Sequence, residues 1–433
     1  MVATLIISII TFLSITASIL FFPTITIKEK RISLYWVIAF LGAILLISTL
    51  LVPIDVIYNK LTENSEVNPL KILVLFFSMT LLSIFLDEAG LFHYLANKAL
   101  KIAKGNQFSL FIILYFLTAI LTIFTSNDVV ILTFTPFICF FCKNAKVKPI
   151  PYLVSEFASA NTWSMMFIIG NPTNIYLATS AGVNFVDYFK VMALPTICCG
   201  LVEFIILLLL FHKPLKAPME ITIDDYKIED KLELIFGVVH LLVCLVLLVI
   251  SNYINFEMWL VSFGCALSLF ICILVSRLIR KKNLRKLPTT IKKLPWQLVP
   301  FILSMFVIVV ALEYQGVAKM IGDAFGDNLI VLKYGASSFV AANIINNIPM
   351  SILFSNLPVS LGGILYKQAI YSSIVGSNIG AFLTPLGALA GIMFTGLLDA
   401  YDVKYGFKEF IKYGLIISIP VISTALIMLF VIL

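Results

Sequence analysis

Long apolar runs separated by short polar loops recur along the whole sequence. A helix needs about 20 residues to cross the roughly 30 Å hydrocarbon core of a bilayer. Every backbone amide in lipid must be hydrogen-bonded within its own segment, so apolar runs of this length are interpreted as helices. The weak alternation typical of a transmembrane barrel is absent. Ten full spans are predicted, near residues 2–22, 33–53, 70–86, 150–180, 188–211, 232–251, 258–278, 297–312, 368–396 and 409–432.

Two further apolar stretches, residues 107–142 and 328–355, carry polar residues at their centres. Basic residues flank the first stretch on both sides, so the chain is expected to return to the side it left. Its second leg, Val129–Phe141, offers about 13 residues or roughly 20 Å of helix, which is short for a crossing. Polar, Pro and Gly residues cut the returning leg of the second stretch even shorter, at Asn356, Pro358, Gly362 and Gly363. We therefore predict two re-entrant hairpins.

Lys and Arg concentrate in alternate loops, and such loops are cytoplasmic in multi-pass proteins. The basic loops lie near residues 28–31, 98–104, 143–148, 213–231, 277–293 and 404–412. This asymmetry predicts a multi-pass protein of the plasma (inner) membrane with both termini outside the cytoplasm. Residues 281–296 are then a basic cytoplasmic connector rather than a domain.

Composition supports the membrane class and excludes several others. The 433 residues are 61% hydrophobic and 12% charged, whereas soluble domains have roughly 25% charged residues. The net charge of +7 comes from the loops and does not indicate a nucleic-acid partner. The seven cysteines lie in apolar segments without metal-ligand or disulfide spacing. No H-E-x-x-H, paired-Asp or P-loop motif is present, so neither an enzyme, a resident metal nor ATP hydrolysis by this chain is expected.

The two halves of the sequence share an order of signals. Leu86–Gly90 follows the third span and Leu312–Gly316 follows the eighth, and each is followed by a hairpin with a polar tip. A long, interrupted span comes next in both halves. An odd number of crossings separates them, which predicts inverted repeats at residues 1–231 and 232–433, each with five spans and one hairpin. Inverted repeats with matching broken helices are the sequence signature of a midplane binding site in secondary transporters.

Polar residues within membrane segments are costly and tend to be functional. The interruptions supply side-chain oxygens, free backbone groups and helix N-termini that suit a cation, an anion or a polar solute. Helix capping and a packing kink are the structural alternatives. A sodium ion could bind at Ser126, Asn127, Asn347 and Asn378. The Asp128 carboxylate could exchange a proton. The candidate substrate- or ion-binding residues are Ser126, Asn127, Asp128, Asn161, Gly170, Asn171, Thr173, Asn174, Asn346, Asn347, Gly376, Ser377, Asn378 and Thr384.

These motifs resemble the ion transporter superfamily, and most closely its arsenical pump membrane protein branch, which is related to the citrate transporters. The resemblance covers nearly the whole chain. It rests on Asn127-Asp128 with Leu132 and Thr135-Pro136, Gly170–Asn174, Asp187–Lys190, Asn346–Pro349, Gly376–Gly380 and Thr384–Gly387. The chain departs from its relatives in having Trp163-Ser164 where many have paired glycines. Its tips read S-N-D and I-N-N rather than the S-N-T of divalent anion–sodium symporters.

The resemblance implies inverted repeats with two hairpins and binding roles for Asn127, Asp128, Asn174, Asn347, Asn378 and Thr384. It favours a proton- or sodium-coupled carrier that works by alternating access, with export of arsenite or antimonite as the leading activity. A sodium-coupled di- or tricarboxylate symporter, a sodium–proton antiporter and a non-transporting receptor remain alternatives. The expected partners are the bilayer and a small-molecule or ion substrate. Whether the chain forms a homodimer, and whether a separate ATPase subunit docks on the basic loops, are left open.

Overall fold

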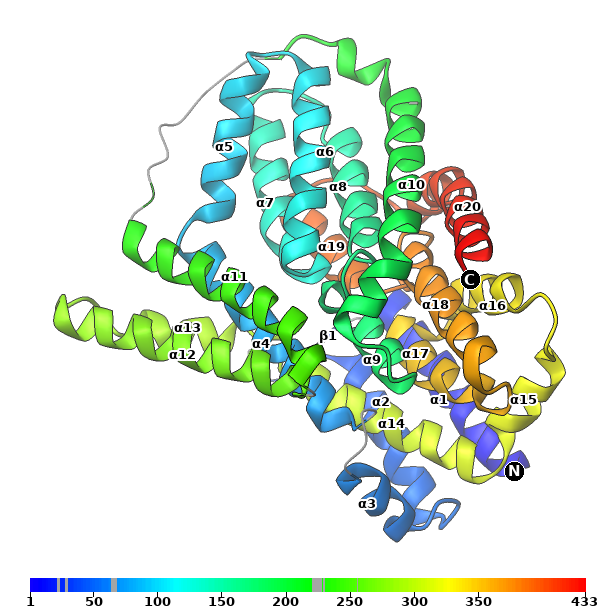
Figure 1. The fold of residues 1–433 in the computed structure, drawn as a ribbon. Helices are drawn as coiled ribbons and strands as arrows, with labels where there is room; N and C mark the ends of the chain where they lie inside the picture. Colours follow the sequence, from blue (N-terminus) through cyan, green and yellow to red (C-terminus); the bar gives the residue numbers. More distant parts are fainter. Residues whose placement is uncertain (22–23, 28–29, 64–67, 220–227, 229, 255) are drawn as a thin grey trace.

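The structure is a computed structural model that describes residues 1–433 except 22–23, 28–29, 64–67, 220–227, 229 and 255 (Figure 1). Lys28 and Lys227 of the predicted basic loops lie outside the described residues. The described residues form helices apart from one antiparallel strand pair, β1 (Thr24–Ile27) and β2 (Lys30–Ser33). The alternating β-branched run Thr24-Ile-Thr-Ile27 suits a strand, a signal that the all-α prediction missed.

The helices confirm a polytopic helical membrane protein. Their bounds are α1 (Val2–Phe21), α2 (Leu34–Ser48), α3 (Ile54–Thr62), α4 (Pro69–Glu88), α5 (Leu91–Ala103), α6 (Gln107–Phe124), α7 (Asn127–Asn144), α8 (Ile150–Trp163), α9 (Pro172–Ser180), α10 (Phe185–Phe211), α11 (Lys231–Ile254), α12 (Met258–Ile279), α13 (Lys286–Lys292), α14 (Leu298–Tyr314), α15 (Val317–Phe325), α16 (Ile330–Ile345), α17 (Asn347–Asn356), α18 (Gly363–Gly380), α19 (Leu389–Ala400) and α20 (Phe407–Ile432). Three short 3₁₀ turns, at Ile168–Gly170, Pro214–Lys216 and Leu357–Ser360, complete the helical structure of the described residues.

Six helices in the described part of the chain, α4, α6, α10, α11, α12 and α20, are long and apolar enough to cross a bilayer alone. A seventh candidate is the pair α14 and α15, which bends by 74°. The other predicted spans are shorter apolar helices, such as α1 and α2, or are interrupted. As predicted, residues 150–180 break into α8 and α9, and residues 368–396 break between α18 and α19.

The order of elements from α4 to α10 recurs from α14 to α20. In both series a long helix ends at a glycine in the left-handed conformation, Gly90 (φ 85°) or Gly316 (φ 76°), where glycine carries no Cβ penalty. A short helix, a helical hairpin, a broken helix and a long helix follow. The assignment of residues 1–231 and 232–433 to two repeats stays a prediction.

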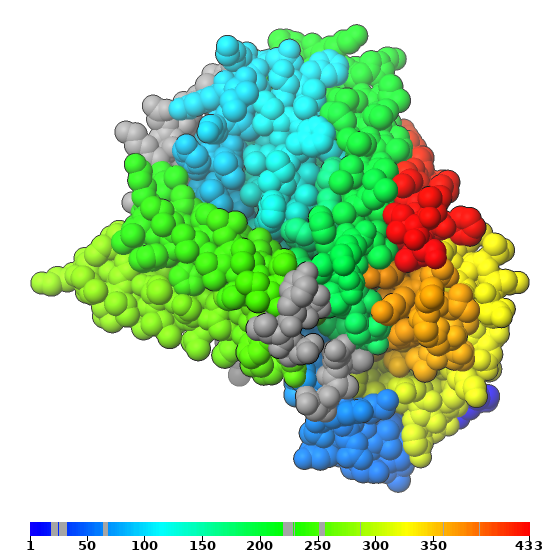
Figure 2. Space-filling view, in the orientation of Figure 1, coloured from blue at the N-terminus to red at the C-terminus, as the bar shows by residue number. Residues whose placement is uncertain are grey.

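Helices of the two series pack against each other in matching pairs. The second leg of the first hairpin, α7, packs on α19, and the second leg of the other hairpin, α17, packs on α9. Likewise α12 packs on α4 and α2 packs on α14. Figures 1 and 2 show α11 and α12 projecting as an arm from the remaining helices. The half of each broken helix that follows the break is therefore held by a hairpin from the other series.

The lengths of the hairpin legs correct part of the hairpin prediction. Both α6 and α7 have 18 residues, or about 27 Å, so the second leg is longer than the predicted Val129–Phe141. Length therefore no longer argues for a re-entrant first hairpin. By contrast, α17 has 10 residues, about 15 Å, and ends at Asn356 as predicted. A helix this short cannot cross a bilayer, which supports re-entry of the second hairpin.

Segments predicted to lie on the same side of the membrane contact each other. On the predicted outer side, the Met1 amino group donates to Gln315 (2.7 Å), Lys60 pairs with Glu313 (3.1 Å) and Gln368 donates to the Leu433 carbonyl (3.0 Å). On the predicted cytoplasmic side, Gln107 donates to the Ala217 carbonyl (2.7 Å).

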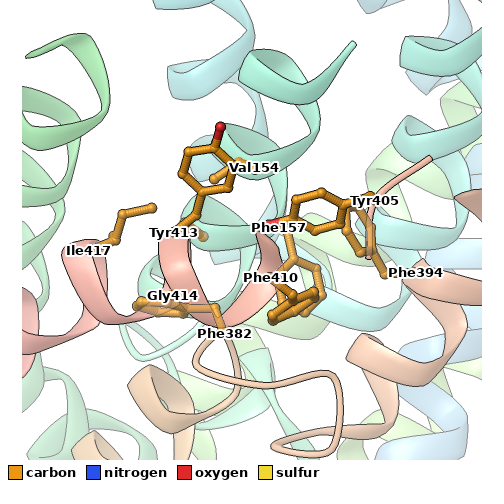
Figure 3. Close-up of a pocket in the computed structure, with 10 residues that line it drawn as sticks. Val154, Phe157, Phe382, Phe394, Tyr405, Phe410, Tyr413, Gly414 and Ile417 are labelled. Atoms are coloured by element: carbon orange, nitrogen blue, oxygen red, sulfur yellow. The ribbon is translucent and has the colours of Figure 1, made fainter. Parts of the chain in front are cut away.

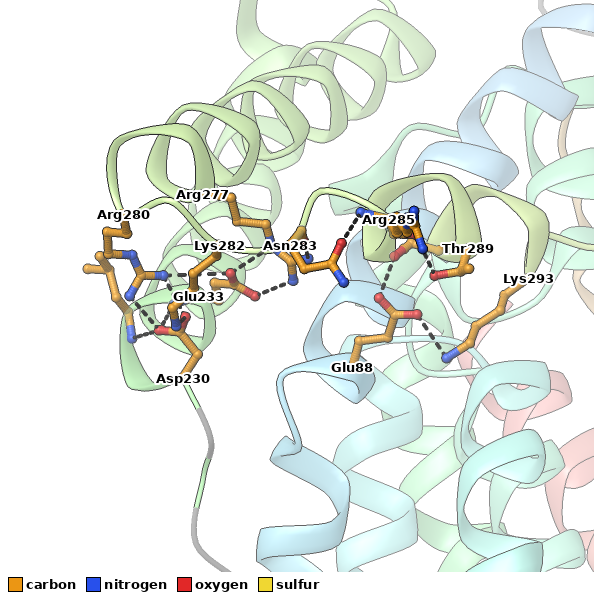
Figure 4. A network of polar contacts seen from close by, with 12 residues as sticks. Glu88, Asp230, Glu233, Arg277, Arg280, Lys282, Asn283, Arg285, Thr289 and Lys293 are labelled. Atoms are coloured by element: carbon orange, nitrogen blue, oxygen red, sulfur yellow. Dashed lines mark hydrogen bonds and ion pairs between the residues drawn. The ribbon is translucent and has the colours of Figure 1, made fainter.

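Ion pairs tie the basic connector to its neighbours (Figure 4). Glu88 of α4 accepts from Lys293 at 2.9 Å and from Thr290. Asp230, which precedes α11, accepts from Arg280 at 2.5 Å and from Lys282. Burial raises the pKa of Asp230, but hydrogen bonds from Arg280 and Lys282 outweigh it and hold the pKa below its ordinary value. The connector contains the short helix α13 and is anchored rather than loose.

Aromatic packing fixes the second break against its surroundings (Figure 3). Phe394 of α19 lies 4.6 Å, centroid to centroid, from Phe157 of α8, and Phe410 of α20 lies 5.5 Å from Phe157. Only about 10 Å³ of cavity remains among these rings and Phe382, no more than about one water. Such close packing makes the position of the break a property of α8 and α20 as well as of α18.

We expect Gly376→Ala to lower the midpoint of thermal unfolding, measured on purified protein in detergent. A Cβ at Gly376 would lie 2.0 Å from Ser338 Oγ and 2.3 Å from the Gly335 carbonyl of α16, and overpacking of this kind costs about 1–3 kcal/mol. Gly396→Ala on α19 is the matched control, because no atom lies within 4 Å of its added Cβ. Equal midpoints for the two variants would contradict the close α16–α18 packing.

Candidate functional site

The first helix break exposes backbone groups that neighbouring side chains then bind. Helix α8 ends at Trp163 and α9 begins at Pro172. The Asn171 side chain caps α9 by accepting from the Thr173 amide at 3.1 Å. A Cβ on Gly170 would lie 2.2 Å from the Ser164 carbonyl oxygen. Gly170 is therefore needed for the close approach of the chain to itself.

Asn378 of α18 joins the two broken helices. Its side-chain oxygen accepts from Ser164 and from Asn171, both at 2.9 Å. Its side-chain nitrogen donates to the Asn174 side-chain oxygen at 2.6 Å and to the Ile374 carbonyl at 2.8 Å. These four bonds use the full capacity of one amide, and Asn378 is fully buried. A single residue therefore holds both sides of the first break.

The network continues on both sides of Asn378. Ser377 donates to Thr173 at 3.1 Å, and the Asn174 side chain donates to the Ser164 carbonyl at 2.9 Å. The Ser164 hydroxyl also lies 2.7 Å from the Asn161 carbonyl, so its single proton is shared between this carbonyl and Asn378. Asn161 in turn accepts from the Asn127 side chain at 3.1 Å. One chain of neutral amides and hydroxyls thus runs from the first hairpin through both broken helices.

Asparagines begin the second leg of both hairpins. Asn127 is the first residue of α7 and Asn347 the first residue of α17, so the positive ends of both helices lie at the tips. Ser126 and Asn347 are buried, and neither the Ser126 hydroxyl nor the Asn347 side-chain oxygen has a hydrogen-bond partner among the described residues. A buried polar atom without a partner costs about 1–3 kcal/mol. The two tips therefore each offer an unused oxygen.

The second tip docks on the second break. The Asn346 side chain donates to the Leu386 carbonyl at 2.9 Å, and the Asn347 amide donates to the Gly387 carbonyl at 3.1 Å. Thr384 donates to Asn343 at 2.7 Å. Asn346 has a positive φ of 70°, a strained conformation for a residue with a side chain. The docking contacts hold the tip in this conformation.

The carboxyl group of Asp128 lies outside the amide network, although the backbone amide of this residue donates to the Asn127 side-chain oxygen at 2.9 Å. It lines a cavity of about 790 Å³ together with Thr80 and Asp87 of α4, Thr133 of α7 and Lys293 of the connector. Thr80 is buried and its hydroxyl has no hydrogen-bond partner among the described residues. The cavity therefore extends from the predicted cytoplasmic connector to the residue next to Asn127.

The structure joins most of the predicted site residues in two groups. The first holds Asn127, Asn161, Asn171, Thr173, Asn174, Ser377 and Asn378. The second holds Asn346, Asn347 and Thr384 around the other break. Gly170 and Gly376 lie where the chain packs closely, and a binding role for them stays a prediction. Ser126 sits at the first tip with an unused hydroxyl.

Two residues of the site were missing from the prediction. Ser164 links Asn161 to Asn378, and Asn343 binds both Thr384 and the Gly380 carbonyl (3.0 Å). The sequence signals were the polar residue directly before the first break and a lone Asn inside the apolar leg of α16. Both were visible, but neither reveals its partner, because the partners lie on other helices.

Crossed packing of hairpins on broken helices around a buried polar network defines a multi-pass secondary transporter. The profile of the citrate transporter family (CitMHS) matches residues 19–363, and the chain belongs to this family. It is 24% identical to the arsenical pump membrane protein of Escherichia coli K12 over 92% of this chain and 94% of that one. It is also 24% identical to the Yersinia enterocolitica protein of the same name, over 81% and 84%. The crystal structure of the Alcanivorax borkumensis YdaH transporter shares the fold, with a TM-score of 0.57 at 14% identity over 99% of this chain and 97% of that one.

Replacement of Asn378 by Ala is expected to destabilise the protein. The change removes one hydrogen bond each from Ser164, Asn171 and Asn174, and a buried polar atom left without its partner costs about 1–3 kcal/mol. Ser373→Ala on the same helix is the control, because that buried hydroxyl bonds only to the Ala369 carbonyl of its own helix (2.7 Å). The thermal unfolding midpoints of both variants, measured in detergent, test the expected destabilisation. We call Asn378 the hub, because it joins the two broken helices. A loss of stability no greater than that of the control would contradict this role.

Proposed function

We propose that this chain exports trivalent arsenite or antimonite across the plasma membrane by alternating access. The observation that carries the proposal is the unused oxygen at each hairpin tip, on Ser126 and on Asn347, beside a network of neutral amides and hydroxyls. Arsenite at neutral pH is an uncharged solute rich in hydroxyl groups. Amides, hydroxyls and helix N-termini suit such a solute without a cysteine ligand. The names of the arsenical pump relatives agree with this substrate class.

The cavity beside Asp128 supports access from the cytoplasm. It is lined by Lys293 of the connector at one end and by Asp128 of the first hairpin. We assign Asp128 as the coupling carboxyl that exchanges a proton with the cytoplasmic side. Sodium is the other coupling ion, and hard cations prefer oxygen ligands. Its candidate ligands are Ser126, Asn127, Asn347 and Asn378.

A sodium-coupled citrate-like symporter is the second candidate. The citrate transporter profile favours it, and Lys292 and Lys293 line the cavity, where a tricarboxylate anion would find opposite charge. Against it, the hydrogen bonds described around Asn378 come from neutral groups. Those groups suit a neutral solute better than a trianion. A sodium–proton antiporter and a receptor have no feature of their own in their favour.

Contacts among the predicted outer segments support both termini outside the cytoplasm, since Met1 binds Gln315 and Leu433 binds Gln368. The exposed, anchored connector offers a surface for a separate ATPase subunit. A homodimer is the expected assembly if the chain oligomerises. We retain the prediction that the chain has no catalytic activity of its own.

Everted membrane vesicles with an imposed pH gradient test the cargo. We expect arsenite accumulation above that of empty vesicles, and its loss in Asp128→Asn because the coupling proton has no acceptor there. Asp187→Asn is the matched control, since Asp187 is an exposed carboxylate in the first turn of α10 that pairs with Lys190 at 3.4 Å. Absence of accumulation in the wild type would rule out arsenite, and uptake of citrate with sodium would then be measured.

Alanine at Asn127 or Asn347 is expected to reduce transport at least about tenfold, equivalent to roughly 1.4 kcal/mol, with normal folding. Each change removes the side chain at the start of a hairpin leg. Asn356→Ala, at the other end of α17, keeps the tip intact and serves as control; its amide bonds to the Ile352 carbonyl. Initial rates of arsenite uptake into the same vesicles test this prediction. Wild-type rates in both tip variants would refute the site assignment.

A further inference from the structure

A buried carboxyl that the proposed function does not use, that of Glu203 on α10, lies outside the amide network. The residue is fully buried. Its two oxygens face Tyr115 of α6, at 3.2 Å, and Thr162 of α8. Tyr115 also contacts the Gly200 carbonyl at 2.6 Å and accepts from the Trp163 indole at 3.1 Å. Three helices therefore meet at one carboxyl group.

Counting protons assigns one to Glu203. The Tyr115 hydroxyl has a single proton, and its shorter contact is with the Gly200 carbonyl, which can only accept. The longer contact, between Tyr115 and Glu203, then needs a proton on Glu203 that is donated to the tyrosine oxygen. With that proton every bond is made: Trp163 and Glu203 donate to Tyr115, Tyr115 donates to Gly200, and Thr162 donates to Glu203.

Among the residues that the structure describes, none places a positive charge beside Glu203 to stabilise a carboxylate. The titratable groups that face it are Tyr115 on α6 and Cys199 on its own helix, and the Cys199 thiol donates to the Thr196 carbonyl at 3.3 Å. From α8, Thr162 donates directly to Glu203. The neutral indole of Trp163 contacts Tyr115 and not Glu203 itself. An isolated carboxylate is costly to bury.

The cluster is coupled to the binding network through adjacent residues. Trp163 contacts Tyr115 and Ser164 binds Asn378, so consecutive residues connect the carboxyl cluster with the hub. Trp163 has little freedom, because a Cβ on Gly200 would lie 2.6 Å from its ring. A shift of Tyr115 or Gly200 is therefore transmitted to the end of α8.

We propose that Glu203 is a second proton-binding site whose occupancy is linked to cargo binding at Asn378. With the proton bound, Tyr115 holds Gly200, Trp163 is fixed, and Ser164 keeps the hub fully hydrogen-bonded. When the proton leaves for water, the carboxylate takes the Tyr115 hydroxyl as donor and Tyr115 releases Gly200. The end of α8 then loosens and Asn378 can exchange a partner for cargo. The proton and the cargo therefore exclude each other, as in an antiporter; this linkage rests on the proposed function.

Infrared spectroscopy of purified protein in lipid tests the proton site without any cargo. The wild type is expected to show the carbonyl stretch of a protonated, hydrogen-bonded carboxylic acid, shifted in D₂O. Glu203→Gln removes this band while keeping a donor to Tyr115 and an acceptor for Thr162. Tyr115→Phe shifts the band, because the acid loses the oxygen to which it donates.

Glu156→Gln is the matched control, since Glu156 is a buried carboxyl of α8 that accepts from Thr135 at 3.0 Å; the band assigned to Glu203 persists there. An unchanged spectrum in Glu203→Gln, or an unshifted band in Tyr115→Phe, would overturn the proton site.

Arsenite affinity measured against pH tests the linkage. One linked proton strengthens binding about tenfold per pH unit as the pH rises, and Glu203→Gln is expected to flatten this dependence. An equally steep dependence in the variant would overturn the linkage. If arsenite does not bind at all, the cargo proposal fails, and the infrared result still decides the proton site.

Discussion

The structure depends on one constraint, which is that a helix broken inside an apolar medium must find partners for the backbone groups it releases. At the first break, side-chain amides supply them. Asn174 binds the Ser164 carbonyl and Asn171 caps the next helix. At the second, Asn346 and Asn343 bind the Leu386 and Gly380 carbonyls. The same asparagines that make the breaks tolerable are the groups that can recognise a polar solute.

Satisfying the breaks also joins the two halves of the protein. Asn378 belongs to the second broken helix but bonds to Ser164, Asn171 and Asn174 of the first. Each hairpin packs on a half-helix from the other series, α7 on α19 and α17 on α9. Neither site can therefore change shape without moving elements of both halves. Such coupling is what alternating access requires, because the two repeats must move against each other around a shared site.

Charge is arranged differently from the amide network. Asp128 faces a cavity that also reaches Asp87 and Lys293, whereas Glu203 is sealed behind Tyr115 and Thr162. The two carboxyls thus differ in access to water, and the proposed proton coupling requires this difference. The anchored connector, bound through Glu88 to Lys293, forms one wall of the open cavity.

The sequence placed one interruption at Gly376–Asn378, which lies inside α18. By itself it nevertheless determined the membrane class, the helical fold and the existence of both breaks and both hairpin tips. These follow from local properties: apolar length predicts spans, and Pro, Gly and Asn interrupt them. The sequence also singled out nearly all of the polar residues that the structure joins by hydrogen bonds, because polar groups in apolar segments stand out one by one. It misjudged the length of α7, where Pro136 is accommodated inside the helix, and it missed the strand pair.

Only the tertiary structure decided which of these residues meet. Asn378 and Asn174 are 204 positions apart yet share a bond of 2.6 Å, and no local pattern encodes such a pairing. The structure separated Asp128 from the amide network and gave Gly376 a packing role. It also showed Ser164 and Trp163 as the connection between the hub and Glu203. Pairing depends on how helices cross, and crossing is set by the complementary shapes of side chains far apart in the chain.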